Sequence, residues 1–472
     1  MPVAACAARA SGRQAGPPTK LASLVADRIV ADIGAAGWPT GEVLGSESDL
    51  LERYGVSRAV FREAVRLLEH RGVARTRRGP GGGLVVAEPS LGSAIDAVMV
   101  YLLFIRAELG EVFEARLALE ESAARLASER LTEDGRTRLR DLAAREAAGG
   151  QTAQWELHAL LASITANPAL ELFVEVLNRV TTLYTPEEAA VSWEVRGASS
   201  EAHARIVDSV IAGDGDRAAR RMRRHLEAWA GFMAERLPAE PRLDDVFVPD
   251  GGAKLAETVA RQLFADVTAS GWNVGELLGS EPDLMHRFDI SRAALREAVR
   301  LLEHHRIARM RRGPGGGLFV AEPGIDATTA ALALHLDRRR IEAVHLFEVR
   351  NIVEMTVLDR VIDGLDDAGV AALRRALEVE AAASSEELPV IGHDFHTVLA
   401  DVAGNRVLAL LADVLVHLSR SRVAVPEPPE EVPTGAVTRA HRGIVDAIAA
   451  RDLDLARQRM RSHLDALVRW VR

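Results

Sequence analysis

The sequence has little cysteine, few aromatic residues and no long apolar run. Cys6 is its one cysteine, so no disulfide can form within the chain, and a reducing compartment is expected. Aromatic residues make up 4% of the 472 residues, and no stretch approaches the roughly 20 apolar residues of a membrane span. With 48% hydrophobic residues, rich in Ala and Leu, we expect a cytoplasmic, mainly α-helical protein of about three or four domains.

One block of residues occurs twice in the chain. Residues 47–89 and 281–323 are identical at 30 of 43 positions without a gap, and residues 203–225 and 441–463 agree at 12 of 23 positions. The offset is 234 residues for the first pair and 238 for the second. A period of about 235 residues is too long for a solenoid. The sequence therefore predicts a two-part module duplicated as a whole.

Positive charge is concentrated in the first part of each module. Eight arginines stand against two glutamates between Arg53 and Arg78, and eight stand against three acidic residues between Arg287 and Arg312. The formal net charge of the chain is nevertheless −10, so the rest of the molecule is acidic. Solvated helix faces would explain one such cluster, but two matching clusters favour patches that contact phosphates.

The first block has the local signals of a small DNA-binding fold. Apolar spacing predicts a helix over residues 21–33, Ser46 caps a short helix that ends at Tyr54, and Ser57 caps a helix over residues 58–70. Two short strands, residues 73–77 and 84–87, then flank a glycine loop. This order predicts a helix-turn-helix followed by a β-hairpin wing.

The pattern S-E-x-D-L, Y-G-V-S-R, F-R-E-A-V-R and R-R-G-P-G-G-G resembles the winged helix-turn-helix of GntR-type bacterial transcription regulators, over about 70 residues in each copy. The resemblance implies that a recognition helix and a wing bind a double-stranded DNA operator. Ser48 and Pro282 stand where the family often has a basic residue, so we expect a different base preference. The implied DNA contacts are Ser57, Arg58, Arg62, Arg78 and Gly79, with Ser291, Arg292, Arg296, Arg312 and Gly313 in the second copy.

The second part of each module is expected to be wholly helical, with breaks at Gly110, Gly149–Gly150, Asn167–Pro168 and Gly213 in the first copy. It is similar to the helical effector domain, often called FCD, of the FadR branch of the same family. The expected boundaries are a disordered tail (1–17), winged domain 1 (18–89), helical domain 1 (91–237), a linker (238–252), winged domain 2 (253–323) and helical domain 2 (325–472).

Three histidines recur in each helical domain. They are His158, His203 and His225, with His396, His441 and His463 in the second copy. Neutral imidazoles from three helices suit a divalent metal such as Zn²⁺, Ni²⁺ or Mn²⁺. The resembling domains add an aspartate one turn before the first histidine, where this chain has Gln154 and Gly392. The alternative interpretation is that the histidines only hydrogen-bond in a polar core.

Arg116 and Arg350 begin a repeated R-x-x-x-E pattern with Glu120 and Glu354. In the resembling domains an arginine at this position binds the carboxylate of a small organic-acid effector, a task that suits the guanidinium fork. The alternative is an internal ion pair with the glutamate four residues later.

These patterns predict a ligand-responsive, sequence-specific transcriptional regulator that is not an enzyme. The alternative is a metal-dependent enzyme that uses the histidine clusters, but no general-base or nucleophile motif accompanies them, and the duplicated arginine-rich wing has no purpose in an enzyme. One chain carries two DNA readers and two effector domains. We therefore expect a pseudo-dimer within the chain, with a homodimer as the alternative.

Overall fold

The computed structural model describes residues 20–77, 79, 81–87, 91–148, 155–184, 193–236, 255–311, 313–339, 341–382, 388–422 and 435–471. The expected tail (1–17) and linker (238–252) lie outside these residues. The chain forms two compact units, Met1–Ser93 and Ala94–Arg472. Among the described residues, no helix is long and apolar enough to cross a membrane.

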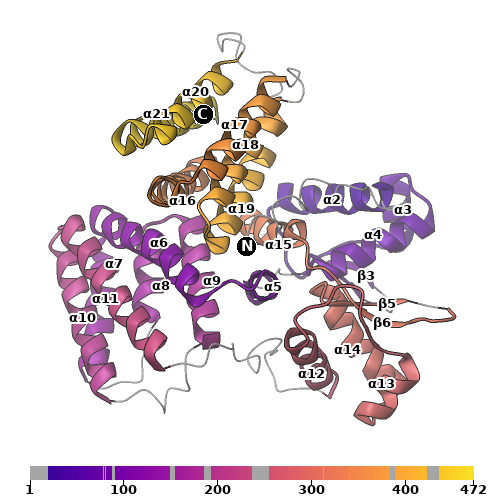
Figure 1. Cartoon of the computed structure of the whole chain (residues 1–472). Coiled ribbons are helices and arrows are strands. Elements are labelled where there is room, and N and C mark those ends of the chain that lie inside the picture. The colour runs from indigo at the N-terminus through magenta and orange to yellow at the C-terminus, as the bar shows by residue number, and fades with distance from the viewer. Residues whose placement is uncertain are drawn as a thin grey trace. The chain divides into compact units, whose positions relative to one another are not determined.

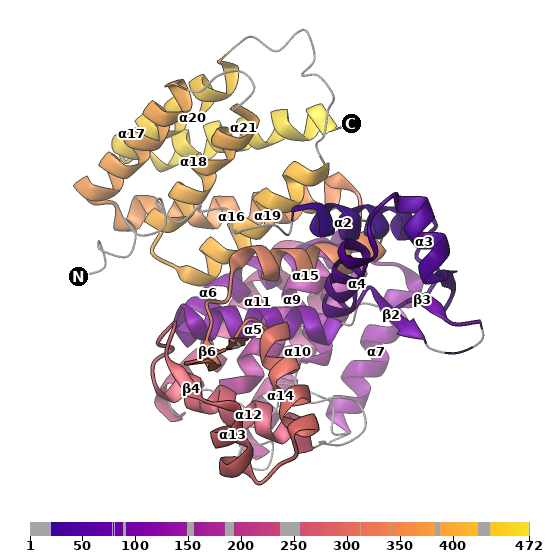
Figure 2. The same ribbon diagram turned by 90° about the vertical axis from the view of Figure 1, so that its right-hand side faces the viewer.

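Between Lys20 and Ala87 the described residues of the first unit form helices and a small antiparallel sheet (Figure 2). Its elements, in chain order, are α2 (Lys20–Ala35), β1 (Val43–Gly45), α3 (Glu47–Tyr54), α4 (Arg58–His70), β2 (Ala74–Arg77) and β3 (Gly83–Val86). Ser46 caps α3 through a reciprocal bond pair with Asp49, and Gly55 ends the helix in the left-handed region at φ 64°. The three expected helices are therefore confirmed.

The wing is a three-stranded sheet rather than the expected two-stranded hairpin. The strand order is β1-β3-β2, with β3 paired to β2 from Ala74↔Val86 to Arg77↔Gly83. The additional strand, β1, has only three residues and no alternation of buried and exposed side chains. It forms because β3 offers its free edge, which is a long-range cause that a local pattern does not contain.

Residues 255–320 repeat this element order at the same spacing. The elements are α12 (Leu255–Ala269), β4 (Leu277–Gly279), α13 (Glu281–Phe288), α14 (Arg292–His304), β5 (Ala308–Arg311) and β6 (Gly317–Val320). The sheet order is β4-β6-β5, and Ala308 pairs with Val320 as Ala74 does with Val86. Asp289 replaces Gly55 in the left-handed region at φ 49°, which aspartate tolerates better than most residues.

The remaining elements are helices, as expected (Figure 1). The first set is α5 (Leu91–Phe104), α6 (Leu109–Glu129), α7 (Glu133–Ala147), α8 (Glu156–Ile164), α9 (Pro168–Tyr184), α10 (Trp193–Ile211) and α11 (Gly215–Arg236). The second set is α15 (Ile325–Arg338), α16 (Ala343–Gly364), α17 (Asp367–Ala382), α18 (Leu388–Val402), α19 (Arg406–Arg422), α20 (Ala436–Ala449) and α21 (Leu453–Val471).

Of the four expected breaks, two are in the right place, one is not, and Gly149–Gly150 lies outside the described residues. Asn167–Pro168 and Gly213 separate helices as expected, whereas Gly110 lies inside the first turn of α6 and the chain turns just before it. A further break, between Glu129 and Glu133, was not expected because no glycine or proline marks it. Thr132 ends the interruption by capping α7 with its side chain.

Each helical set forms a bundle around a long central helix. In the first bundle α6 packs along α11 and α9, and in the second α16 packs along α19 and α21. The first core is built from fully buried aliphatic side chains of α6, α7, α8, α10 and α11, among them Leu139, Leu157 and Leu226. The two bundles meet where α6 packs against α16 and α19 and where α9 packs against α16.

The close approach of β1 and β3 leads to the first prediction. A Cβ atom added at Gly83 would lie 2.3 Å from the carbonyl oxygen of Gly45, and the residue has φ +154°. We expect Gly83→Ala to lower the free energy of unfolding of the winged region by about 1–3 kcal/mol in a urea titration. Gly110→Ala, in a helix with open space around it, is the control and should stabilise by at most about 1 kcal/mol. Equal effects of both substitutions would contradict the prediction.

Candidate functional sites

The arginines Arg58, Arg62 and Arg66 of α4 lie on the surface, but each forms an ion pair within the protein. Arg58 Nε and Arg62 Nε lie 3.5 and 3.0 Å from one carboxylate oxygen of Glu47, at the start of α3, and Arg66 pairs with Glu63 at 2.8 Å. The arginine side chains remain 62–73% exposed. Ser57 accepts a hydrogen bond from the backbone of Val60 as the helix cap. Glu47 thus holds Arg58 and Arg62 together at the N-terminal end of α4.

The second copy has the same arrangement. Arg292 Nε lies 3.0 Å and Arg296 Nε 4.0 Å from Glu281, and Ser291 caps α14 through the backbone N–H of Ala294. Glu47 and Glu281 were not among the residues we expected at these sites. The signal that could have revealed them is their position directly after a capping serine, which brings the start of one helix beside the start of the next.

The wing tips are accessible at their glycines. Gly79 and Gly313 both have φ +99°, and no heavy atom lies within 4 Å of the position a Cβ would take. A backbone of this kind can approach another molecule closely because no side chain intervenes. Arg78 and Arg312, two of the expected contacts, lie outside the described residues.

Three histidines converge in the first bundle from α8, α10 and α11. Each of His158, His203 and His225 offers a ring nitrogen, and these atoms all lie within 4.8 Å of one another. The Nε2 atoms of His203 and His225 are 3.2 Å apart. His158 and His203 are buried, and His225 is half-buried. The three residues that recur in the sequence are therefore brought together.

Two glutamates hold the outer nitrogens of this cluster. His158 Nδ1 contacts Glu120 Oε2, and His203 Nδ1 lies 3.0 Å from Glu146 Oε1. A carboxylate on one ring nitrogen fixes the ring and favours the tautomer whose proton is on that nitrogen. The Nε2 lone pairs of His158 and His203 are then left pointing inward, toward the third histidine.

The second bundle repeats the cluster with deeper burial. The Nε2 atom of His463 lies 3.2 Å from those of both His396 and His441. His441 Nδ1 lies 2.7 Å from Glu380 Oε2, and His396 Nδ1 lies 2.7 Å from Glu354 Oε2. Glu380 is the equivalent of Glu146, and all three of these histidines are buried.

Burial favours the neutral form of His158 and His396, while Glu120 beside His158 remains charged. It lowers the pKa of His396 to about 4 and also lowers the pKa of His158. Burial alone would raise the pKa of Glu120, but the positive Arg116 beside it and the contact with His158 outweigh that effect and hold the value at about 2. A neutral imidazole is the form that binds a metal. The donor set therefore fits a divalent cation.

The expected aspartate position adds nothing to the donor set that the structure describes. Gln154 lies outside the described residues, and Gly392, in α18 one turn before His396, has no side chain. Three imidazoles without a carboxylate would leave coordination positions for water or a ligand oxygen. Glu146 and Glu380, which no sequence pattern singled out, support the cluster from outside it.

Arg116 and Arg350 do pair with the glutamate four residues later. Arg116 Nε donates to Glu120 Oε1 at 2.6 Å and its Nη1 to Thr181 Oγ1 at 3.2 Å, and Arg350 Nε donates to Glu354. Both arginines are buried. In the second bundle Nη2 of Arg350 is buried with no hydrogen-bond partner among the described residues. The Arg350 side chain thus forms the internal ion pair through Nε and still offers a buried N–H donor at Nη2.

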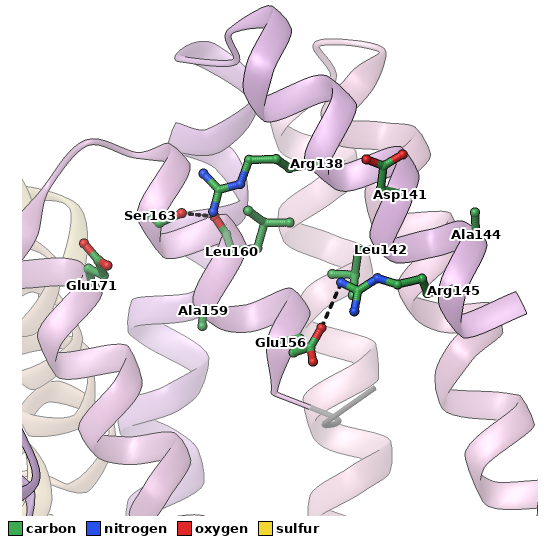
Figure 3. Close-up of a pocket in the computed structure, with 10 residues that line it drawn as sticks. All are labelled: Arg138, Asp141, Leu142, Ala144, Arg145, Glu156, Ala159, Leu160, Ser163 and Glu171. Carbon is green, nitrogen blue, oxygen red and sulfur yellow. Dashed lines mark hydrogen bonds and ion pairs between the residues drawn. The ribbon is translucent and has the colours of Figure 1, made fainter. Parts of the chain in front are cut away.

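A groove of about 880 Å³ lies elsewhere, against α7 and α8 of the first bundle (Figure 3). It is lined by Arg138, Asp141, Leu142, Ala144, Arg145, Glu156, Ala159, Leu160, Ser163 and Glu171. Arg145 pairs with Glu156 at 3.1 Å, and no histidine of the cluster lines it. Its paired, exposed charges are typical of a solvated surface, so the groove is separate from the histidine site.

Two family models match the chain. One is described as the FCD domain and matches residues 111–228 and 345–466, and the other, described as bacterial regulatory proteins of the gntR family, matches residues 21–84. The first contains both histidine clusters, with His158 and His396 among its matched residues, and the second contains α3 and α4. The FCD model alone covers about half of the chain.

Individual proteins are similar to slightly less than half of the chain. The HTH-type transcriptional repressors NanR of Salmonella newport (strain SL254) and Citrobacter rodentium (strain ICC168) are each 27% identical over 220 residues, which is 45% of this chain and 84% of the relative. The solved structure titled Streptococcus agalactiae GntR is 24% identical, with a TM-score of 0.33, and the match covers 45% of this chain and 99% of that one.

Proposed function

Since the chain belongs to the GntR-type bacterial regulators that carry an FCD domain, we propose that it reads one operator with two winged domains and senses a small carboxylate through a divalent metal in each helical domain. It is a DNA-binding transcriptional regulator whose helical domains respond to an effector, and this choice over a metal-dependent enzyme is confirmed by both family models and by the NanR relatives. The expected domain boundaries, the second DNA reader and the residues below belong to the proposal.

The second winged domain is supported by the repetition of structure and sequence. The gntR model matches residues 21–84 alone, but residues 255–320 have the same helices, the same sheet order and the same capped, arginine-bearing helix. A match to about half of this chain also spans most of a relative. We therefore assign α4 and α14 as two recognition helices, each with a wing that carries Gly79 or Gly313.

DNA binding would redirect arginines that Glu47 and Glu281 hold in the free protein. Arginine can bind guanine bidentately, and a serine at a helix start can bond a phosphate. Arg58 and Arg62 share one carboxylate in the first copy, and Arg292 and Arg296 share one in the second. The glutamate would release these exposed side chains at small cost because surface ion pairs are weak.

Arg58→Ala with Arg62→Ala should weaken specific binding at one half-site, by about 1–3 kcal/mol for each arginine that binds a base bidentately. Arg292→Ala with Arg296→Ala should do the same at the other half-site. Footprinting and a titration of the DNA upstream of the protein's own gene measure both effects. Arg138→Ala, an exposed arginine of α7, is the control. Parent-like footprints from both double variants would show that these helices do not read the DNA.

The helical domains are proposed to hold a divalent cation such as Zn²⁺, Ni²⁺ or Mn²⁺ and a carboxylate effector together. His158, His203 and His225 would bind the first ion, and His396, His441 and His463 the second, leaving open positions for ligand oxygens. When bound, the ion supplies a positive centre that attracts a carboxylate. The support for the effector is the buried Nη2 donor of Arg350, with Arg116 at the equivalent position.

Protein purified without chelator should contain up to two divalent ions per chain. His203→Ala and His441→Ala should each remove one ion, because each substitution removes one of three ligands from a different bundle. Metal analysis of the purified variants measures the loss. His417→Ala, an exposed histidine of α19, is the control and should retain both ions. Effector-responsive protein that contains no metal would rule the ion out of the sensing mechanism.

The two helical domains of one chain are proposed to form the dimer that members of this family usually form between chains. Asn167 Nδ2 donates to the backbone oxygen of His345 and to Glu348, and Asn405 Nδ2 donates to the backbone oxygen of Glu111 and to Glu114. These residues are equivalent in the two copies. The contacts therefore follow an approximate two-fold relation, which is the geometry of an isologous pair.

One chain should accordingly cover one pseudo-palindromic operator. The effective concentration of one half near the other is in the millimolar range for a short linker, so pairing within a chain should exceed pairing between chains. Light scattering of the free protein and of its DNA complex should give the mass of one chain in both. A stable two-chain particle that binds one operator would mean that the duplication built a four-headed regulator.

A further inference from the structure

Beyond the matched contacts, the two bundles are joined by ion pairs that occur on one side only. Arg406, the first residue of α19, donates from Nε to both oxygens of Glu111 at 3.0 Å and from Nη2 to Glu108 at 3.1 Å. Its backbone N–H also donates to Glu111, at 2.7 Å, and its Nη1 to the carbonyl oxygen of Ile105, at 3.1 Å. The equivalent of Arg406 in the first half is Pro168, which can form none of these contacts.

The interface contains a second one-sided ion pair. Arg339 Nη1 lies 2.6 Å from Glu171 Oε2, between the end of α15 and the first turn of α9. The equivalent residues are Ile105 in the first half and Ala409 in the second, so this pair has no counterpart either. In both ion pairs the second half provides the arginine and the first half provides the glutamate.

The charges are therefore complementary between unlike halves and not between like halves. Two first halves would place Glu111 opposite Pro168 and Glu171 opposite Ile105, so every glutamate would be without its arginine. Two second halves would place Arg339 opposite Ala409 and Arg406 opposite His345. Glu342, the equivalent of Glu108, would be the one carboxylate left for Arg406 among these positions. Glu111 is only 12% exposed, so the absence of its partner would leave a poorly hydrated charge.

The other ion pairs across the interface do not distinguish the halves. Arg130 binds Glu348 and also the carbonyl oxygen of Thr165, and Arg360 binds Glu114 and also the carbonyl oxygen of Ala403. These arginines come from positions one helical turn apart in their copies, yet they bind equivalent groups. Pairs of like halves would retain ion pairs of this kind, whereas the Arg406–Glu111 and Arg339–Glu171 pairs could not form.

We propose that Arg406 and Arg339, with Glu111 and Glu171, are the residues that make the first half of this chain pair with a second half and not with its own kind. We call Glu108, Glu111 and Glu171 of the first half the acidic edge, and Arg339 and Arg406 of the second half the basic edge. The partner that fits the acidic edge is thus the basic edge of a second half. This extends the pairing proposed above by naming what selects it. Specificity of this kind arises from attraction in the correct pair together with uncompensated charge in the wrong one.

The test uses the full chain with one cysteine in each half. In a Cys6→Ser background, Arg130→Cys and Glu348→Cys place thiols at side chains that touch, and a short bis-maleimide joins them. A gel separates a product closed within one chain from a product that links two chains. The closed product should dominate in this background at every protein concentration.

Reversing the basic edge, with Arg339→Glu and Arg406→Glu, should lower the yield of the closed product several-fold. Added salt should raise that yield again, since it screens the repulsion between two acidic edges, while it lowers or leaves unchanged the yield of the parent. Reversing the acidic edge as well, with Glu111→Arg and Glu171→Arg, should restore the closed product. Arg138→Glu with Arg374→Glu, on exposed faces of α7 and α17, is the matched control and should behave as the parent.

Three results would overturn the proposal. The first is a parent-like yield from the reversed basic edge. The second is a reduced yield that salt does not change, and the third is a four-residue exchange that folds by circular dichroism but does not restore pairing. A parent that gives only two-chain products would overturn the pairing within the chain. The role of the charges would then be tested on the two-chain product. Its yield should fall when the basic edge is reversed and recover when the acidic edge is reversed as well.

Discussion

A buried arginine–glutamate–histidine triad at the centre of each bundle is the interaction on which the candidate metal site depends. Arg116 holds Glu120 in its ionised state, Glu120 orients His158, and His158 completes the cluster with histidines from two other helices. Taking these charges out of water is costly, and removing one partner of a buried pair leaves the other uncompensated. The three groups therefore depend on one another, and substitution of one destabilises the other two. A shift of α6 relative to α8 would break the contact between Glu120 and His158.

This constraint also explains where the two halves of the chain agree and where they differ. The offset is 234 residues as far as Glu146 and Glu380 and 238 residues from His158 and His396 onward, so four residues are added between Glu380 and His396. The cluster histidines and the glutamates beside them are repeated, whereas residues at the rim of the interface, such as Pro168 and Arg406, are free to differ.

Sequence alone predicts the structure correctly where a local signal decides it. Ser57 and the glycine at residue 55 define the start of α4, and the histidines stand out because they recur while their neighbours change. Prediction fails where a distant residue decides. Glu146 is one of several acidic residues in α7, and only the packing of α10 shows that it contacts His203. The strand β1 and the pairing of Arg58 with Glu47 likewise depend on residues that are far apart in the sequence or on a neighbouring helix.

A dimer of identical chains presents every substitution twice, at positions related by its symmetry axis. In this chain the approximate two-fold relation joins unlike sequences, so an arginine at residue 406 occurs once and faces Glu111 without also appearing at residue 168. One edge of the assembly can therefore change while the other stays fixed. The same would hold for the proposed recognition helices α4 and α14, each of which could adapt to one half of a target sequence. Covalent fusion thus allows the two halves to carry different residues at equivalent positions, which the symmetry of a homodimer forbids.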